Sequence, residues 1–470
     1  MTPRHFIVWG INYAPELTGI APYNTALCEF LSSQGHRVSM VTSFSYYPEW
    51  RKRAEDRRRW SRTDVAKGVS IHRCWHYVPG KPSTVRRILH ELSFVTTSLL
   101  RILVMPKPDA YVVVSPPLLL GFAAWVASVL KRAPFVFHVQ DLQPDTASSM
   151  GMLRSGPLLK ALYALESLAY RKASRVSGIS PGMIRAFERK GVPRAKTLLF
   201  PNGVQLKARE PLPQSGAFRE RLGICPTDLL AVYSGNLGAK LGVEILLESA
   251  RFLEHRGIRI VICGDGARRQ ALEKLGNEMK LTNVIFLPLQ PEKEYLEMME
   301  DADVYLVTQL PGSGSLFFPS KLLKGLALSK AIVVVADDDS ELTRSAREGR
   351  FALVVDPRHP ERLANALEHL AKDPEQRRAL GRAGRIYVDR FEQKYILSKF
   401  EHDLIDLVEE TRQGKQLVPV EIGSQPAARE SIREFPVDKS RHGEPSSQSQ
   451  TGSAVGRGLD NDPKPFLHGQ

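Results

Sequence analysis

The chain has 470 residues, 43% of them hydrophobic, so it is too long for one ordinary core and apolar enough to fill two. Its four cysteines lie far apart, which indicates neither a zinc site nor a disulfide framework and favours a reducing compartment. The stretch before Asn12 is too short and too poorly flanked for a signal peptide, so we expect a cytoplasmic protein.

In the first half of the chain, β-rich segments alternate with helical patterns. The β-rich segments are 6–13, 37–44, 69–76, 110–115, 135–141, 175–180 and 197–203. This alternation predicts a parallel, doubly wound sheet. We therefore expect an N-terminal Rossmann-like domain over residues 1–203, followed by a polar, proline-containing linker over residues 204–228.

Two stretches of this half bear on membranes. Residues 110–130 carry no charge and are long enough to cross a bilayer, but Pro116 and Pro117 divide them, so we predict a buried strand and a helix instead. The basic run 51–62 is either a solvated surface or a contact with an anionic membrane, for which residues 93–104 would supply an apolar face. No aromatic-interleaved basic motif indicates a nucleic acid.

The second half repeats this architecture without repeating the sequence. Its β-rich segments are 229–235, 258–264, 284–289, 303–309, 331–337 and 351–356. We expect a second Rossmann-like domain over residues 229–385 and a closing helix over 386–411. Residues 412–470 are rich in Gly, Pro, Ser, Gln and mixed charges, a composition that cannot bury a core, and they are predicted to be a disordered tail.

The stretch SGNLGAKLG, residues 234–242, stands where a strand passes into a helix. Gly235 and Gly238 let backbone amides approach an anion, and the helix that follows directs its positive end to the same place. Lys240 adds a full positive charge, and Asn236 offers hydrogen bonds to a phosphate or a sugar. The stretch matches neither G-x-G-x-x-G nor the P-loop, and by itself it is as compatible with a plain tight turn.

Two further segments have a similar glycine-containing turn before a helical pattern. Gly264 and Gly266, in ICGDG, follow the next β-rich strand, while Ser320 and Lys321 open a helix after a glycine- and serine-rich stretch. Ligands of open α/β sheets bind outside the carboxyl ends of the strands. Three anion-compatible turns in one domain therefore predict a site for a nucleotide diphosphate.

The joint order of these motifs resembles glycosyltransferase family 4. SGNLGAKLG, CGDG, PSKLLKGLA and FALVVDPRHPERLANAL look like the C-terminal donor domain of that family, and INYAPELTGIAPYNTALCEFLSSQGHRVSMVTS resembles its opening strand, glycine loop and first helix. QDLQPDTASSMGML and PSK look closest to the bacterial exopolysaccharide branch of the colanic-acid-biosynthesis type. The resemblance covers about residues 4–411 and implies the GT-B fold, an α/β architecture of two doubly wound Rossmann-like domains facing each other across a cleft.

The resemblance also implies an activity. A nucleotide-diphosphate-sugar would bind in the C-terminal domain, and its sugar would pass, with retention of configuration, to a polyprenyl-linked saccharide held by the N-terminal domain. Lys240, Lys321 and the amides near Gly235 would stabilise the leaving diphosphate, so no metal or other cofactor is expected. Gly19 matches the family's glycine loop near the donor phosphate. The enzyme would associate peripherally with the anionic inner face of the cytoplasmic membrane.

The sequence departs from the family at two places. A common His-Asp pair is Gln140-Asp141 here, and His138, two residues upstream, points to the same sheet face as Gln140. We expect Asp141 and His138 to line the sugar pocket, although a satisfied core histidine remains the alternative for His138. The positions of two family glutamates hold Leu316 and Lys324, neither of which accepts hydrogen bonds as a carboxylate does. Lys324 would contact phosphate or face solvent.

Other functions stay open at this point. A nucleotide-sugar epimerase of the same fold would need no acceptor, and the missing glutamates suggest a non-catalytic, membrane-associated assembly factor. A nicotinamide oxidoreductase is least favoured, because no G-x-G-x-x-G follows the first strand. Asp337, Asp338 and Asp339 precede a helix, which favours a capping region over a divalent-metal site.

Overall fold

The computed structural model describes residues 2–17, 19–47, 49–80, 83–149, 156–206, 215–312 and 321–414. All of them belong to one compact unit, Met1–Glu421. The tail predicted to be disordered lies outside the described residues from position 415 onward.

Within the described residues, eight strands form the first sheet, in the order β3-β4-β2-β1-β5-β6-β7-β8. The strands are β1 (His5–Trp9), β2 (Arg37–Ser43), β3 (Ser61–Ala66), β4 (Val69–Cys74), β5 (Ala110–Ser115), β6 (Phe135–Val139), β7 (Arg175–Gly178) and β8 (Thr197–Leu199). The neighbours pair in parallel except β3 with β4, which are antiparallel. Strand β3, SRTDVA, was not predicted, because it is polar and largely exposed and so carries no apolar pattern.

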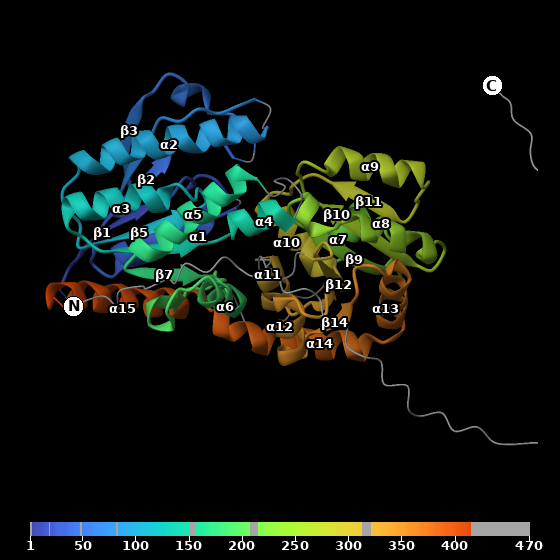
Figure 1. Cartoon of the computed structure of the whole chain (residues 1–470). Coiled ribbons are helices and arrows are strands. Elements are labelled where there is room, and N and C mark those ends of the chain that lie inside the picture. The colour runs from blue at the N-terminus through green and yellow to red at the C-terminus, as the bar shows by residue number, and fades with distance from the viewer. Residues whose placement is uncertain are drawn as a thin grey trace, which may run out of the picture. The chain divides into compact units, whose positions relative to one another are not determined.

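Both faces of this sheet are covered by helices (Figure 1). The helices are α1 (Ala21–Ser33), α2 (Thr84–Val104), α3 (Leu120–Lys131), α4 (Gln143–Ser149), α5 (Pro157–Lys172) and α6 (Pro181–Arg189). Ile7 and Trp9 of β1 join the core under α2 and α3, while Phe6 and Val8 join the core on the α1 side. A strand buried on both faces reads as a continuous apolar run, and this is why FIVW predicted a strand correctly.

The uncharged stretch 110–130 is the predicted strand and helix. Strand β5 is buried along its whole length, and α3 begins after the two prolines. No helix in the described ranges is both long and apolar enough to span a membrane.

The described part of the second half contributes a six-stranded parallel sheet, in the order β11-β10-β9-β12-β13-β14. Its strands are β9 (Leu229–Ser234), β10 (Ile258–Cys263), β11 (Val284–Leu287), β12 (Val304–Thr308), β13 (Ala331–Val335) and β14 (Ala352–Val355). Its helices are α7 (Ala217–Arg221), α8 (Glu244–Ala250), α9 (Arg269–Glu278), α10 (Glu292–Asp301), α11 (Lys321–Ala327), α12 (Glu341–Gly349), α13 (Pro360–Lys372) and α14 (Pro374–Val388). The strand order reverses beside β9, which is where doubly wound sheets bind ligands.

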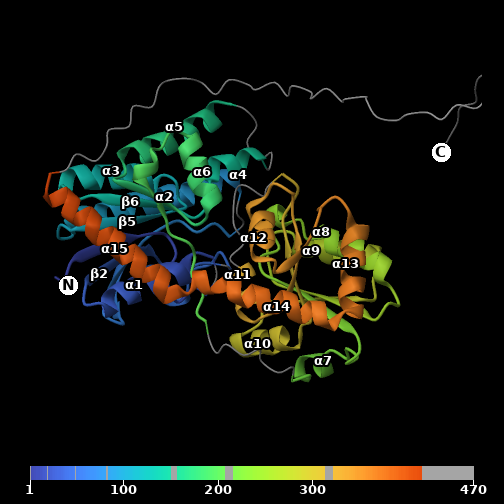
Figure 2. The ribbon, with the colours of Figure 1, turned by 90° about the horizontal axis from the view of Figure 1, so that it is seen from below.

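The last described helix, α15 (Gln393–Arg412), returns to the first sheet. It lies along β2, β5 and α1 (Figure 2). The ring of Phe400 stacks on that of Phe200 with centroids 3.8 Å apart, and Glu401 accepts a hydrogen bond from His36 at 2.9 Å.

The chain crosses from one sheet to the other twice, and backbone hydrogen bonds join the two crossing segments. Val204 donates its backbone N–H to Phe391 at 2.9 Å and accepts from Gln393 at 3.0 Å. A Cβ on Gly203 would lie 2.7 Å from the Cα of Gln393, so only glycine allows this approach.

Candidate active site

The glycine turns after β9 and β10 pack directly on each other. Ser234 lies beside Cys263 in the parallel register, so both strands end at the same edge of the sheet. Gly235, Gly264 and Gly266 have φ angles of +149°, +156° and +155°, which side chains rarely adopt. A Cβ on Gly264 would lie 1.8 Å from the carbonyl oxygen of Gly235. The predicted glycines are therefore required for the two turns to meet.

The helix predicted after the stretch 234–242 is α8, which begins at Glu244. Lys240 precedes it on a short 3₁₀ helix, Ala239–Leu241. Gly242 separates the two with a φ of +56°, and a Cβ there would lie 3.1 Å from the Cα of Leu310. Gly242 therefore packs closely against the loop after β12, at a position that favours glycine.

Lys240 and Asp141 form an ion pair between the two sheets. The Lys240 Nζ lies 3.2 Å from Asp141 Oδ1, and about a third of each side chain is exposed (28% and 35%). Asp141 comes directly after β6 of the first sheet, whereas Lys240 follows β9 of the second. Two of the residues predicted to act in catalysis thus lie together, although 99 positions separate them in the sequence.

Lys321, at the start of α11, is half-buried, and its Nζ is buried beside the same glycine turn. Its Nζ lies 3.6 Å from the ring centroid of Tyr233 and has no hydrogen-bond partner among the residues that the structure describes. A Cβ on Gly235 would lie 3.4 Å from the Lys321 Cδ. Burial holds the pKa of Lys321 well below its usual value. A buried cation without an acceptor is costly, and an anion bound at the turn would satisfy it.

Lys324 lies one turn further along α11 and contacts a different element. Its Nζ lies 5.1 Å from the ring centroid of Tyr295 on α10. Burial lowers the pKa of Lys324, and the Glu292 carboxylate opposes that shift. Ser320 and Leu316, which the sequence analysis also singled out, lie outside the described residues.

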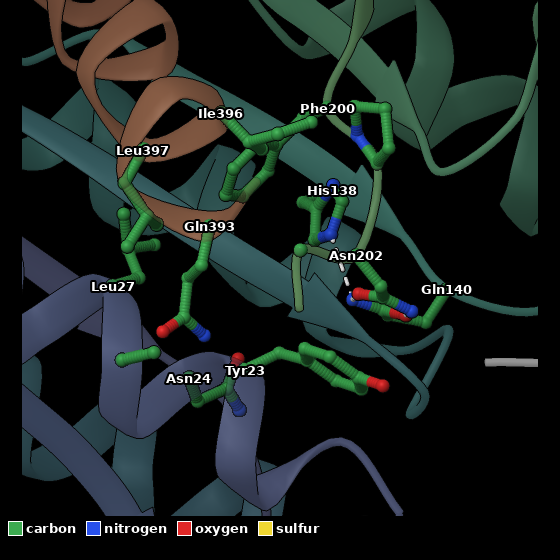
Figure 3. A pocket seen from close by; sticks show the side chains of 13 residues that line it. Tyr23, Asn24, Leu27, His138, Gln140, Phe200, Asn202, Gln393, Ile396 and Leu397 are labelled. Carbon is green, nitrogen blue, oxygen red and sulfur yellow. Dashed lines mark hydrogen bonds between the residues drawn. The ribbon is translucent and has the colours of Figure 1, made fainter. Parts of the chain in front are cut away.

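His138 is fully occupied by hydrogen bonds. Its Nδ1 lies 2.8 Å from the Ser177 hydroxyl and its Nε2 lies 2.9 Å from the Gln140 amide, which in turn exchanges two hydrogen bonds with Asn202. Burial lowers the pKa of His138 to about 3, so the ring is neutral. Figure 3 shows His138, Gln140 and Asn202 on one wall of a small pocket, with Tyr23 and Gln393 opposite.

The loop after β1 carries Gly19, whose φ of +66° again favours glycine. A Cβ on Gly19 would lie 3.7 Å from the ring of Tyr47. Burial and Glu16 raise the pKa of Tyr47, and Asp265, in the turn after β10, adds to the rise.

Sequence reasoning missed Glu16 in this loop. Its carboxylate accepts hydrogen bonds from the backbone N–H groups of Tyr46 and Tyr47 at 2.8 and 3.0 Å, and from Asn12 at 2.8 Å. Burial raises the pKa of Glu16. A single glutamate between Pro15 and Leu17 gives no periodic signal, so only the folded loop reveals that it holds the loop after β2.

The acidic run after β13 is engaged in local contacts. Asp337 pairs with Arg358 at 2.6 Å and accepts from the Gly312 N–H at 2.6 Å. The side chain that caps α12 is Ser340, which accepts from Thr343 at 3.0 Å. In the described ranges no three His, Cys, Asp or Glu side chains are grouped so as to hold a metal ion.

Comparison with known proteins gives the family. Residues 18–203 match the family described as glycosyl transferase 4-like domain, and residues 215–387 match glycosyl transferases group 1. The putative colanic acid biosynthesis glycosyl transferase WcaI of Escherichia coli (strain K12) is 30% identical over 407 residues, which are 85% of this chain and 99% of that protein. The chain belongs to this glycosyltransferase family. It is therefore an enzyme that transfers a glycosyl group.

Solved structures confirm the fold of this glycosyltransferase. Sucrose-phosphate synthase from Thermosynechococcus elongatus superposes with a TM-score of 0.70 at 19% identity, over 86% of this chain and 99% of that one. Anabaena Alr3699/HepE in complex with UDP-glucose superposes with a TM-score of 0.63 at 15% identity, over 86% and 100% of the two chains. The predicted GT-B fold with two Rossmann-like sheets is confirmed.

Proposed function

We propose that this glycosyltransferase moves a hexose from a nucleotide-diphosphate-sugar to a polyprenyl-linked saccharide during bacterial exopolysaccharide biosynthesis of the colanic acid type. The name of the E. coli relative WcaI supports the pathway, and the UDP-glucose complex of HepE supports the class of donor. Association with the inner face of the cytoplasmic membrane, and retention of configuration, are parts of the same proposal.

The observation that carries the proposal is the group of donors at one edge of the second sheet. The ammonium groups of Lys321 and Lys240 both come from segments at or beside this edge, where the glycine turns after β9 and β10 meet. The N–H groups of Gly235 and Gly264 themselves donate to the carbonyls of Cys263 and Leu287 at 3.0 Å, so the two lysines carry the proposal. A nucleotide diphosphate is the ligand whose charge such donors match.

The chemistry follows from where charge develops. When the bond between the sugar and the diphosphate breaks, negative charge grows on the diphosphate, and donors fixed before the reaction stabilise it without a metal. Lys240 is held by Asp141 until the diphosphate replaces that carboxylate. Asp141 then lies free beside the anomeric end of the donor, where it orients sugar hydroxyls, while the neutral His138 lines the acceptor side and supplies no charge.

The acceptor is assigned to the first sheet. Gly19 and the loop that Glu16 holds follow the carboxyl ends of β1 and β2, as Asp141 follows β6, so an acceptor bound there would lie at the same edge of the first sheet as Asp141. Lys324 stands where relatives place a glutamate for the ribose, and its contact with α10 leaves ribose recognition to other groups.

The experiment is a thermal-shift screen with UDP-, GDP- and dTDP-sugars, followed by incubation of the preferred donor with and without lipid-linked acceptor. A ligand present at about 100 times its Kd raises the free energy of unfolding by about 2.7 kcal/mol. We expect stabilisation by one nucleotide class and a glycosylated lipid only when acceptor is present. An epimerised sugar from donor alone would instead establish the epimerase, and saturable binding without any product would establish the assembly factor.

A further inference from the structure

A basic pocket opens at the end of the first sheet that faces away from the glycine turns. It has a volume of about 180 Å³ and lies among β2, β4 and the C-terminal end of α2. Arg37 and Ser39 of β2 and Ser70 and His72 of β4 line it, and Arg101 of α2 completes it. These strand positions lie at the amino ends of β2 and β4, whereas the active-site loops follow the carboxyl ends.

The pocket is polar because of the sheet register. Ser39 lies directly beside Ser70, and side chains two residues apart share a face, so Arg37 and His72 extend the same polar surface. This face is apolar further along the strands, where Val41 and Cys74 join the core under α2. A polar end on an otherwise buried face of a sheet indicates either a ligand-binding site or contact with solvent.

The groups in the pocket are suited to an anion. Arg101 donates to His72 Nδ1 at 2.9 Å, and burial together with Arg101 lowers the pKa of His72 to about 4, so the ring accepts this bond in its neutral form. Among the described residues, neither Arg37 nor Arg101 forms an ion pair. Asp109 acts electrostatically on neighbouring His5, but its oxygens accept from the His5 N–H at 2.8 Å and from Arg412 at 2.7 Å. Paired guanidinium groups with hydroxyls favour phosphate.

The rim of the pocket is apolar and exposed. Val104, which lines the pocket, is 76% exposed, and Leu100, one turn earlier on α2, is 59% exposed. Val65 of β3 lies opposite Ser70 and is 73% exposed. A water-soluble phosphate would make no contact with these apolar side chains. The acyl chains of a phospholipid, by contrast, would lie against them while its phosphate occupies the pocket.

The rim continues as a stripe along the whole of α2. Its exposed apolar residues are Val85, Ile88, Leu89, Leu92, Leu100 and Val104. Their spacing of three, four or eight places them on one face of a helix about 31 Å long, opposite the face that packs in the core. The helix carries three arginines and a single acid, Glu91, whose pKa is raised by burial to about 7. This charge matches an anionic bilayer surface.

We propose that the pocket of Arg37, Ser39, Ser70, His72 and Arg101 binds the phosphate of an anionic phospholipid while the exposed stripe of α2 lies against the bilayer. This inference deepens the membrane association within the proposed function and rests on it. The proposed lipid site lies at the amino ends of β2 and β4, so a bound lipid would not block the glycine turns after β9 and β10.

The test is co-sedimentation of the full-length protein with phosphatidylcholine vesicles that contain or lack phosphatidylglycerol. We expect binding only to the phosphatidylglycerol vesicles. The Arg101→Gln variant should lower the partition coefficient about fivefold, and Arg37→Gln combined with it should lower the coefficient about 25-fold, as expected for basic groups at a charged surface. Arg101→Lys should retain most of the binding because it keeps the charge.

The matched control is Arg382→Gln, which removes the same charge from the exposed surface of α14 and should leave vesicle binding unchanged. The Leu100→Ser, Val104→Ser variant should weaken vesicle binding although no charge is lost. Melting temperatures of all variants show that they are folded. Equal binding of the wild type to both vesicles, or a double arginine variant that binds like Arg382→Gln, overturns the proposal.

Two further outcomes distinguish lipid binding from binding of a soluble phosphate and from an effect on glycosyl transfer. Stabilisation by glycerol phosphate without any vesicle binding would show a site for soluble phosphate and overturn the lipid. Vesicle binding is measured without donor or acceptor, so it does not depend on glycosyl transfer. Conversely, loss of vesicle binding in the arginine variants with unchanged transfer to a detergent-solubilised acceptor is the result expected for a docking site separate from the active site.

Discussion

Replacing Lys321 by methionine should stabilise the empty protein while weakening nucleotide binding. The Lys321 Nζ is buried without an acceptor in the described part of the chain, and methionine fills a similar volume without the charge. An unsatisfied buried polar group costs about 1–3 kcal/mol, and more when it is charged. The cation–π contact with the Tyr233 ring, at 3.6 Å, stabilises the charged Lys321 by up to about 2 kcal/mol and so offsets part of this cost.

The balance predicts that Lys321→Met raises the free energy of unfolding by about 1 kcal/mol, a rise in Tm of about 1 °C for a chain of this size. The gain should depend on pH with a definite sign. Because the folded-state pKa of Lys321 lies below its usual value of 10.5, the unfolded chain binds more protons between those two values, and the cost to the wild type grows as pH falls from 10.5. The pH-dependent part of the variant's advantage should therefore vanish as pH approaches 10.5, which leaves only the cost of an unpaired neutral amine.

Nucleotide affinity should change in the opposite direction. The ammonium of Lys321 makes a charge-assisted hydrogen bond to the diphosphate in our account, and such a bond contributes about 1.5–3 kcal/mol, so the Kd for UDP, or for whichever nucleotide the screen selects, should rise at least about tenfold. Calorimetric titration measures the Kd and scanning calorimetry the Tm. Lys274→Met, on the exposed side of α9, is the control and should change neither. A variant with a lower Tm and an unchanged Kd would refute the reasoning.

Two more predictions concern the contacts around the turns. Asp141→Asn removes the carboxylate that competes for Lys240, so the nucleoside diphosphate alone should bind up to about fivefold more tightly, the limit for an exposed ion pair; weaker binding in the same titration would contradict this. Gly264→Ala should lower the free energy of unfolding by about 2 kcal/mol or more through backbone strain and the clash with the Gly235 carbonyl. Gly216→Ala, which has a positive φ but open space around its Cβ, should cost clearly less by the same melting measurement, and equal losses would show that the contact between the turns is unimportant.

The sequence predicted most of the strands because parallel strands that are buried on both faces read as apolar runs. FIVW, AYVVVS and AIVVV are such runs, and each is a strand in the structure. Strand β3 was not predicted, because its exposed sequence SRTDVA has no apolar pattern. It is an edge strand that pairs only with β4.

The candidate site was predictable only where backbone geometry dictates residue type. Gly264 and Gly266 stand where a Cβ would clash, and Gly235 has a φ angle that favours glycine, so the constraint is local enough to leave a motif. The pairing of Asp141 with Lys240 and the burial of Lys321 over Tyr233 join segments far apart in the chain, and no local pattern encodes such contacts. The pocket of Arg37 and Arg101 was missed for the same reason, because it depends on the register of β2 with β4.

The central claim, that Lys240 stabilises a diphosphate leaving group, is tested most directly by kcat/KM for glycosyl transfer in Lys240→Ala. The fixed charge at the leaving group predicts a fall of about 10²-fold or more at an unchanged Tm. An unchanged kcat/KM in a folded Lys240→Ala enzyme would contradict the account.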